Sequence, residues 1–185
     1  MAGLPHFTNS AAGVKLYEPV YLNQFEVLIT PPASVTLANT RFRGEGILTQ
    51  QVKKISGLAV DIQPEMLAII NERSRINRVK NVETVLGKTD DTCLKPESVD
   101  LILLVDVYHE FDKPFEMTSS MVKSLKKGGR VVFVEYCKED RRVPIKEVHK
   151  MSQAQLRKEL ALFPVKWVET NPSLPWQHIV IFEKL

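Results

Sequence analysis

The pattern of apolar and polar positions changes character near residue 56. Downstream, short and nearly continuous apolar runs alternate with amphipathic stretches, as expected of buried strands separated by helices. Strands are predicted at 58–62, 82–86, 100–107, 130–136, 165–169 and 178–182, and helices at 64–76, 113–126 and 152–162. This alternation predicts right-handed βαβ units and a mostly parallel sheet. The last two strands leave no room for a helix between them, so we expect an antiparallel hairpin at the edge of the sheet.

Local signals set the expected ends of the helices. Pro64 suits the first turn of the first helix, where its missing N–H has no partner to lose. Asp112 is placed to cap the second helix, and 128–129, a pair of glycines, is expected to end it. Ser152 followed by Gln155 fits a capping box, which predicts the start of the third helix.

Residues 1–55 have a different composition, rich in Thr, Asn, Pro and aromatic residues. They contain one strong strand candidate, 25–30, which Pro31 and Pro32 terminate. The segment 47–55 is compatible with either a strand or a helix. We therefore divide the chain into an atypical, β-rich N-terminal segment at 1–55 and an α/β domain at 56–185.

Charge and cysteine content narrow the function classes. The chain of 185 residues has a net charge of +3, which is too small to indicate a nucleic-acid partner. No apolar run approaches the roughly 20 residues that span a bilayer, and no secretory signal pattern is visible. Cys93 and Cys137 lack metal-type spacing, which favours reduced thiols and predicts no metal site. We expect a cytoplasmic protein without membrane or nucleic-acid partners, of undetermined oligomeric state.

Three sequence motifs occur in a familiar order. They are LAVDIQPEML at 58–67, SVDLILLVDVYHEF at 98–111 and LKKGGRVV at 125–132. Together with the terminal hairpin, this set resembles class I, Rossmann-like, S-adenosylmethionine-dependent methyltransferases over about 130 residues. The resemblance implies a doubly covered α/β sheet, S-adenosylmethionine as the cofactor, and transfer of its methyl group to a small-molecule acceptor.

The resemblance also implies roles for five residues in binding the cofactor. Asp61, at the end of a strand, would hold the two ribose hydroxyls, although it could instead cap the following helix. Ile62 and Gln63 would line the same pocket. Asp90 would accept a hydrogen bond from the adenine amino group, with a solvated turn as the alternative. Asp106, which follows the next strand, would complete the cofactor site.

The loop after the strand at 100–107 is where the methyl acceptor meets the cofactor in the family. His109 is the candidate general base, because the reference pKa of histidine lies near neutrality. Tyr108 is the candidate for positioning the acceptor. The alternative for His109 is a loop histidine bonded to a backbone carbonyl. Glu135 is expected at the edge of the pocket, and His149 and His178 show no partner in their spacing, which predicts structural roles.

The glycine-rich loop that follows the first strand of the family is missing. Gly44 and Gly46 form the only glycine pair upstream, but no apolar strand leads into them and we treat them as a chance match. The first strand is therefore absent, or the segment 25–30 replaces it with 47–55 as the next helix. Loss of two charge-assisted hydrogen bonds would weaken cofactor binding by about 10²- to 10⁴-fold, so the enzyme is expected to be impaired.

The N-terminal segment carries a second resemblance. The stretches YLNQFEVLIT at 21–30 and ILTQQVKKISGL at 47–58 resemble the start of tail-tube proteins of contractile-tailed phages. This resemblance implies a structural protein that assembles through its first residues. A Rossmann-like binding module without catalysis is the third alternative.

Overall fold

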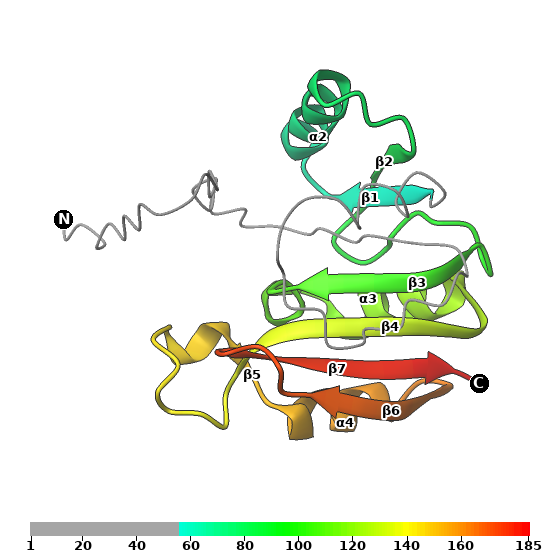
Figure 1. The fold of residues 1–185 in the computed structure, drawn as a ribbon. Coiled ribbons are helices and arrows are strands. Elements are labelled where there is room, and N and C mark those ends of the chain that lie inside the picture. The colour runs from blue at the N-terminus through cyan, green and yellow to red at the C-terminus, as the bar shows by residue number, and fades with distance from the viewer. Residues whose placement is uncertain (1–55) are drawn as a thin grey trace, which may run out of the picture.

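The computed structural model describes residues 56–185 (Figure 1). The strands are β1 Gly57–Asp61, β2 Val82–Leu86, β3 Val99–Val105, β4 Leu125–Cys137, β5 Lys150–Met151, β6 Val165–Asn171 and β7 Gln177–Lys184. The α-helices are α2 Pro64–Ile76, α3 Pro114–Ser124 and α4 Gln153–Leu160, and two short 3₁₀ helices are η1 Tyr108–Glu110 and η2 Glu147–His149. The expectations for the strand at 25–30 and the segment 47–55 lie outside the described residues.

The larger sheet has the strand order β3-β4-β7-β6, with β5 paired to the end of β4. β3 and β4 are parallel, whereas β7 runs antiparallel to both β4 and β6. A parallel sheet that ends in an antiparallel hairpin confirms the predicted α/β class. None of the described helices has the length and apolar character needed to cross a membrane.

The sheet is interrupted between β1 and β3. β1 pairs in parallel with β2 in a separate two-stranded sheet, and no strand of the described residues joins this pair to β3. Figure 1 shows β1 and β3 pointing in the same direction. The first strand of the family would lie in this position, and the segment considered as its replacement, 25–30, is outside the described residues. The two sheets are nevertheless joined by packing, because Val60 of β1 belongs to the main core.

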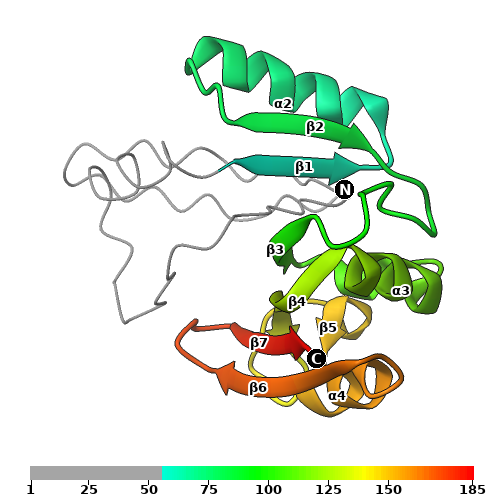
Figure 2. The ribbon, with the colours of Figure 1, turned by 90° about the vertical axis from the view of Figure 1, so that its right-hand side faces the viewer.

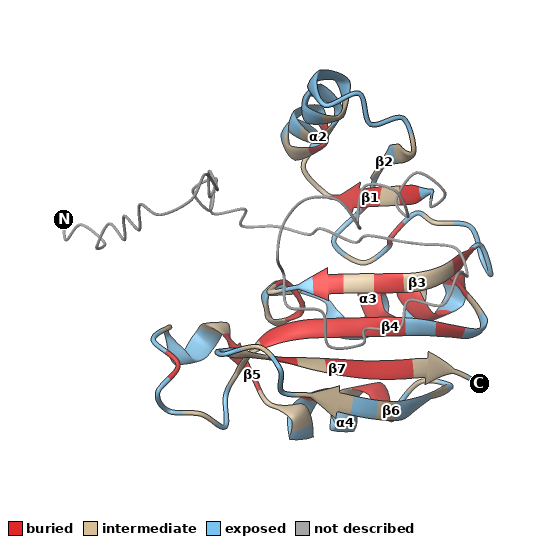
Figure 3. Ribbon diagram, in the orientation of Figure 1, coloured by how far each residue is buried: buried red, intermediate tan, exposed pale blue. Residues whose placement is uncertain are grey.

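The main core lies between the larger sheet and the helices α3 and α4, which cover one face of it (Figure 2). Its fully buried members include Ile102, Leu104, Phe133 and Val180 from the strands and Met121, Leu156 and Leu160 from the helices. Figure 3 shows the burial running along β3, β4 and β7. A smaller cluster of Val132, Val134 and Ile181 lies on the other face.

Two of the three predicted helix starts are confirmed. α2 spans Pro64–Ile76, as predicted. α4 follows Ser152, whose Oγ accepts a hydrogen bond from the backbone N–H of Gln155 at 3.0 Å. The prediction that Asp112 caps the next helix is wrong. α3 begins with Pro114 at its first position and has no side-chain cap, because proline already presets the helical φ angle.

The glycine pair enters a strand and does not end the helix. α3 ends at Ser124, and β4 passes through both glycines. Gly128 has a φ of +74°, which is unfavourable for any side chain. A Cβ on Gly129 would lie 2.8 Å from the carbonyl oxygen of Lys126 and 3.2 Å from that of Asp100. Both glycines are therefore required by the bulged start of β4.

Candidate functional site

The candidate residues lie at the carboxyl ends of the parallel strands. In open α/β sheets this edge is where ligands bind. The ends of β1, β3 and β4 contribute residues to it, and the start of β7 reaches the same edge because that strand is antiparallel.

Asp61 ends β1 and is only 1% exposed. Its Oδ1 accepts a hydrogen bond of 2.7 Å from the backbone N–H of Gln63, which is the N-cap residue of α2. Its own carbonyl accepts from Gly87 N–H at 2.9 Å. The carboxylate therefore shapes the turn into α2. Ile62, in the same turn, packs against the main core.

The acidic pair after β2 is tied to α3 and its N-cap residue. Asp90 accepts a hydrogen bond of 2.9 Å from Lys113 Nζ, and this cation lowers the pKa of Asp90 below its usual value. Asp91 Oδ1 accepts from Ser120 Oγ at 2.7 Å and from the backbone N–H of Cys93 at 2.9 Å. Asp90 remains 39% exposed, so the structure gives it a surface ion pair and leaves it accessible.

Asp106 lies directly after β3 in a left-handed conformation, with a φ of 52°. Its backbone N–H donates to the carbonyl oxygen of Val134 at 2.7 Å, and its Oδ2 accepts a hydrogen bond from the side-chain Nε2 of Gln177. Its Oδ1 is buried and has no hydrogen-bond partner among the described residues. Burial raises the pKa of Asp106, and the nearby charge of Glu135 acts in the same direction.

Tyr108 is part of the core and does not face the ligand edge. It is 3% exposed, and its ring makes edge-on contacts with Phe111 and Phe133. Its hydroxyl donates to Glu159 of α4 at 2.9 Å, and burial raises its pKa well above the ordinary value. Thr118 of α3 donates to the same hydroxyl at 3.4 Å, so both of its hydrogen-bond partners come from helices. The role of Tyr108 in positioning an acceptor stays a prediction, which this burial does not favour.

His109 is held by a buried carboxylate. Its Nδ1 lies 2.6 Å from Oε2 of Glu135, which is fully buried on β4. Glu135 Oε1 accepts from the backbone N–H groups of Tyr108 at 2.8 Å and Val107 at 3.3 Å. Burial acts to lower the pKa of His109, but the hydrogen bond to Glu135 and the surrounding carboxylates outweigh it, so the pKa is raised. A carboxylate therefore takes the place of the backbone carbonyl considered in the sequence analysis.

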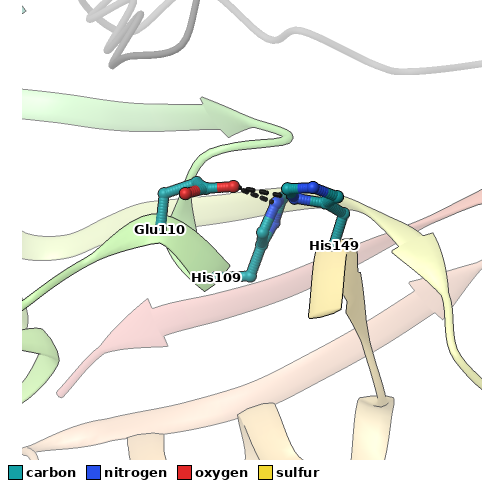
Figure 4. Close-up of side chains that lie close together, drawn as sticks. All are labelled: His109, Glu110 and His149. Carbon is teal, nitrogen blue, oxygen red and sulfur yellow. Dashed lines mark hydrogen bonds and ion pairs between the residues drawn. The ribbon is translucent and has the colours of Figure 1, made fainter. Parts of the chain in front are cut away.

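Glu110 and His149 complete a cluster with His109 (Figure 4). Oε1 of Glu110 lies 3.2 Å from Nε2 of His109 and 2.8 Å from Nδ1 of His149. The two imidazole rings meet edge to face, with their centroids 5.5 Å apart. His149 comes from η2, so the cluster joins the loop after β3 to the loop after β4. This contact could not be predicted from the sequence, because no spacing signal connects Glu110 with His149, which lies 39 positions later.

A second cluster lies farther along the same edge. Cys137 donates from Sγ to Glu139 at 3.3 Å, and His178 Nδ1 lies 3.9 Å from the same carboxylate. His178 is buried, its Nε2 has no hydrogen-bond partner among the described residues, and burial lowers its pKa.

With this geometry established, comparison with known proteins identifies the family. Residues 43–133 match the family model described as a methyltransferase domain. This match, together with the fold, supports a class I methyltransferase. S-adenosylmethionine is the cofactor of this class. The match begins before the boundary that we drew at residue 56, and it includes Gly44 and Gly46.

Solved structures support the methyltransferase fold. A SAM-dependent methyltransferase from Aquifex aeolicus is 18% identical, with a TM-score of 0.68 over 75% of this chain and 76% of its own. An O-methyltransferase family 2 protein from Planctomyces limnophilus, in complex with apigenin, is 20% identical, with a TM-score of 0.59 over 75% of this chain and 46% of its own.

An O-methyltransferase from neocarzinostatin biosynthesis is a third similar structure. It was solved with S-adenosyl-L-homocysteine and 1,4-dihydroxy-2-naphthoic acid. It is 19% identical, with a TM-score of 0.63 over 75% of this chain and 44% of its own. A search of the curated proteins found no match. The comparisons do not support the resemblance to phage tail-tube proteins, and that resemblance falls almost wholly outside the described residues.

Proposed function

We propose that this methyltransferase domain binds S-adenosylmethionine and transfers its methyl group to a small molecule held at the carboxyl edge of the sheet. The observation that carries the proposal is Asp61. A buried carboxylate ends β1 in a chain whose matched span covers this strand. A carboxylate at that position suits a ribose, because it accepts hydrogen bonds from two neighbouring hydroxyls.

The described residues fit the adenosine half of the cofactor. Asp61 would hold the ribose, and Ile62 and Gln63 would border it in the turn into α2. Asp90 would accept from the adenine amino group through the accessible part of its carboxylate. Asp106 would face the amino-acid end, where its Oδ1 has no partner among the described residues. An ammonium group is a suitable partner for such an oxygen.

His109 is the residue that we propose meets the acceptor. S-adenosylmethionine supplies a methyl group on a sulfonium, which is already an activated leaving group, so the protein must chiefly position the acceptor. Nε2 of His109 is the nitrogen that does not face Glu135. It lies 3.2 Å from Oε1 of Glu110, where it can share a proton or bind an ion. Relatives of the same fold were solved with phenolic compounds, which supports a small hydroxylated acceptor.

A calorimetric titration of the full chain with S-adenosylhomocysteine tests the proposal. One molecule bound per chain with micromolar affinity would support a competent cofactor site. The alternative is a non-catalytic Rossmann-like binding module. A folded chain that binds no S-adenosylhomocysteine would overturn the proposal in favour of this alternative. Weak, millimolar binding would identify the impaired enzyme that the missing glycine-rich loop predicts.

A further inference from the structure

The cluster of His109, Glu110 and His149 has the composition of a metal site. Each residue offers one ligand atom, and the three atoms lie within 4.8 Å of one another. Two imidazoles and one carboxylate recur as the protein ligands of catalytic zinc and of other first-row ions. We propose that this cluster binds one divalent transition-metal ion, with Zn²⁺ as the ion best suited to the three donors.

The spacing of the ligand atoms fits a tetrahedral ion. Ligand atoms about 2.0–2.1 Å from a tetrahedral ion lie roughly 3.3 Å from one another. Nε2 of His109 and Oε1 of Glu110 are 3.2 Å apart, which matches this separation. Nδ1 of His149 lies 2.8 Å from the same oxygen, so its ring needs to withdraw by about half an ångström. His149 is partly exposed in a short 3₁₀ helix, which gives it room to do so.

Glu135 prepares His109 for this role. A carboxylate can only accept, so Nδ1 of His109 donates its proton to Oε2 of Glu135 at 2.6 Å. The lone pair of Nε2 then points toward the oxygen of Glu110. Metal-bound histidines commonly donate their other ring N–H to a carboxylate in the same manner, which fixes the tautomer and the ring orientation. Glu135 is itself fixed by two backbone N–H groups, so the support is rigid.

Nε2 of His109 and Oε1 of Glu110 face each other, so a proton or a metal ion must lie between them. Two acceptor atoms 3.2 Å apart repel each other unless a proton or a metal ion lies between them. Without a metal, a proton must lie between the two atoms, and the cluster is then a set of hydrogen bonds joining η1 to η2. Protons and the metal ion therefore compete for the same position. This metal-free cluster is the alternative that the experiment must exclude.

The donor set also discriminates among ions. Mg²⁺ and Ca²⁺ prefer oxygen ligands, whereas imidazole nitrogens suit Zn²⁺, Co²⁺ and Ni²⁺. Three protein ligands leave at least one position open, as in catalytic zinc sites. On the basis of the proposed function, this open position would hold an oxygen of a hydroxylated acceptor. The ion would lower the pKa of that hydroxyl, whose proton leaves to water. No metal site was expected from the sequence, because the spacing of the two cysteines gives no metal signal and the three ligands proposed here are histidines and a glutamate.

The test is a competition titration of the metal-stripped full chain with Zn²⁺ against a chromophoric chelator. We expect one ion per chain, an affinity at least 10-fold weaker in His149→Ala, and a 10- to 100-fold loss in Glu135→Gln. Co²⁺ in place of Zn²⁺ should show the intense visible absorption of a low-coordinate site. Circular dichroism confirms that each variant is folded. Because no S-adenosylhomocysteine is present, the result is independent of the cofactor site.

A matched control comes from the second cluster. Cys137→Ser removes the thiol beside Glu139 and leaves the three proposed ligands untouched. We expect this variant to bind Zn²⁺ with unchanged affinity. No stoichiometric binding, or binding that His149→Ala leaves unchanged, would overturn the proposal and leave the metal-free, hydrogen-bonded cluster. If Cys137→Ser loses Zn²⁺ binding and His149→Ala retains it, the ion binds at the second cluster. This result would also overturn the proposal.

Discussion

Glu135 of β4 and His109 of η1 stand 26 residues apart in the chain, and their side chains meet in a hydrogen bond of 2.6 Å. The carboxylate also accepts from two backbone N–H groups at the start of η1. One fully buried side chain therefore fixes both the loop that carries the candidate site and the orientation of its imidazole.

Glu135 should be important for stability as well as for the site. Glu135→Ala leaves the N–H groups of Val107 and Tyr108 buried without an acceptor, so we expect a loss of about 2–5 kcal/mol in the free energy of unfolding. Glu135→Gln retains an acceptor oxygen and should lose about 1 kcal/mol. Urea denaturation measures both. Glu169→Gln, at an exposed position of β6, is the control and should change little.

Asp61 should be needed for cofactor binding beyond its part in the turn. In Asp61→Asn the side-chain oxygen can still accept from Gln63, but the charge that would favour the ribose hydroxyls is lost. We expect about 10-fold or weaker binding of S-adenosylhomocysteine by calorimetry. Asp100→Asn, at the opposite end of the larger sheet, should bind normally. Equal affinities in the two variants would refute the ribose assignment.

Substitution of Tyr108 tests whether this residue has a packing role or a catalytic role. Tyr108→Phe removes the hydroxyl that donates to Glu159 and keeps the ring against Phe111 and Phe133. We expect a loss of about 0.5–1.5 kcal/mol in the free energy of unfolding, and an unchanged rate of methyl transfer once an acceptor is known. A rate that falls 100-fold in a stable variant would restore the catalytic role expected from the sequence.

The glycines at the start of β4 should differ in their tolerance of alanine. Gly129→Ala brings its Cβ to 2.8 Å from a backbone oxygen, so the strand must shift, at a cost of about 1–3 kcal/mol. Gly128→Ala meets no atom within 4 Å and has only its positive φ to overcome, at about 1–2 kcal/mol. Thermal unfolding should therefore place Gly129→Ala at or below Gly128→Ala in melting temperature.

Local chemistry explains what the sequence predicted well. α2 and β2 occur at the predicted residues, because a proline at the first helical position and a short stretch rich in β-branched residues are local signals. The hairpin of β6 and β7 followed from a connection too short for a helix. Asp112 failed as a cap because Pro114 determines where α3 begins. The neighbouring Lys113 instead binds Asp90, a long-range contact that no local pattern reveals.

The candidate site was predictable only in part, because its contacts join distant segments. The resemblance placed Asp61, Asp106 and His109 at strand ends, and the structure brings each to the carboxyl edge. It could not show that His149 reaches Glu110 from the far side of a long loop. The burial of the Tyr108 hydroxyl was equally hidden, since α4 supplies its partner 51 residues later.

Among residues 56–185, the sheet is interrupted between β1 and β3, so the residues of the ligand edge belong to two separate sheets. Asp61 belongs to the unit of β1, α2 and β2, and His109 belongs to the larger sheet. In the described residues no strand-to-strand hydrogen bond joins the two units, which are held by the packing of Val60 and by contacts of Thr92 with Ser120. Within residues 56–185, a small rotation of one unit against the other would therefore change the distance between the donor and acceptor halves without breaking a β-ladder. In this part of the chain, the span across which a methyl group would travel is set by side-chain contacts.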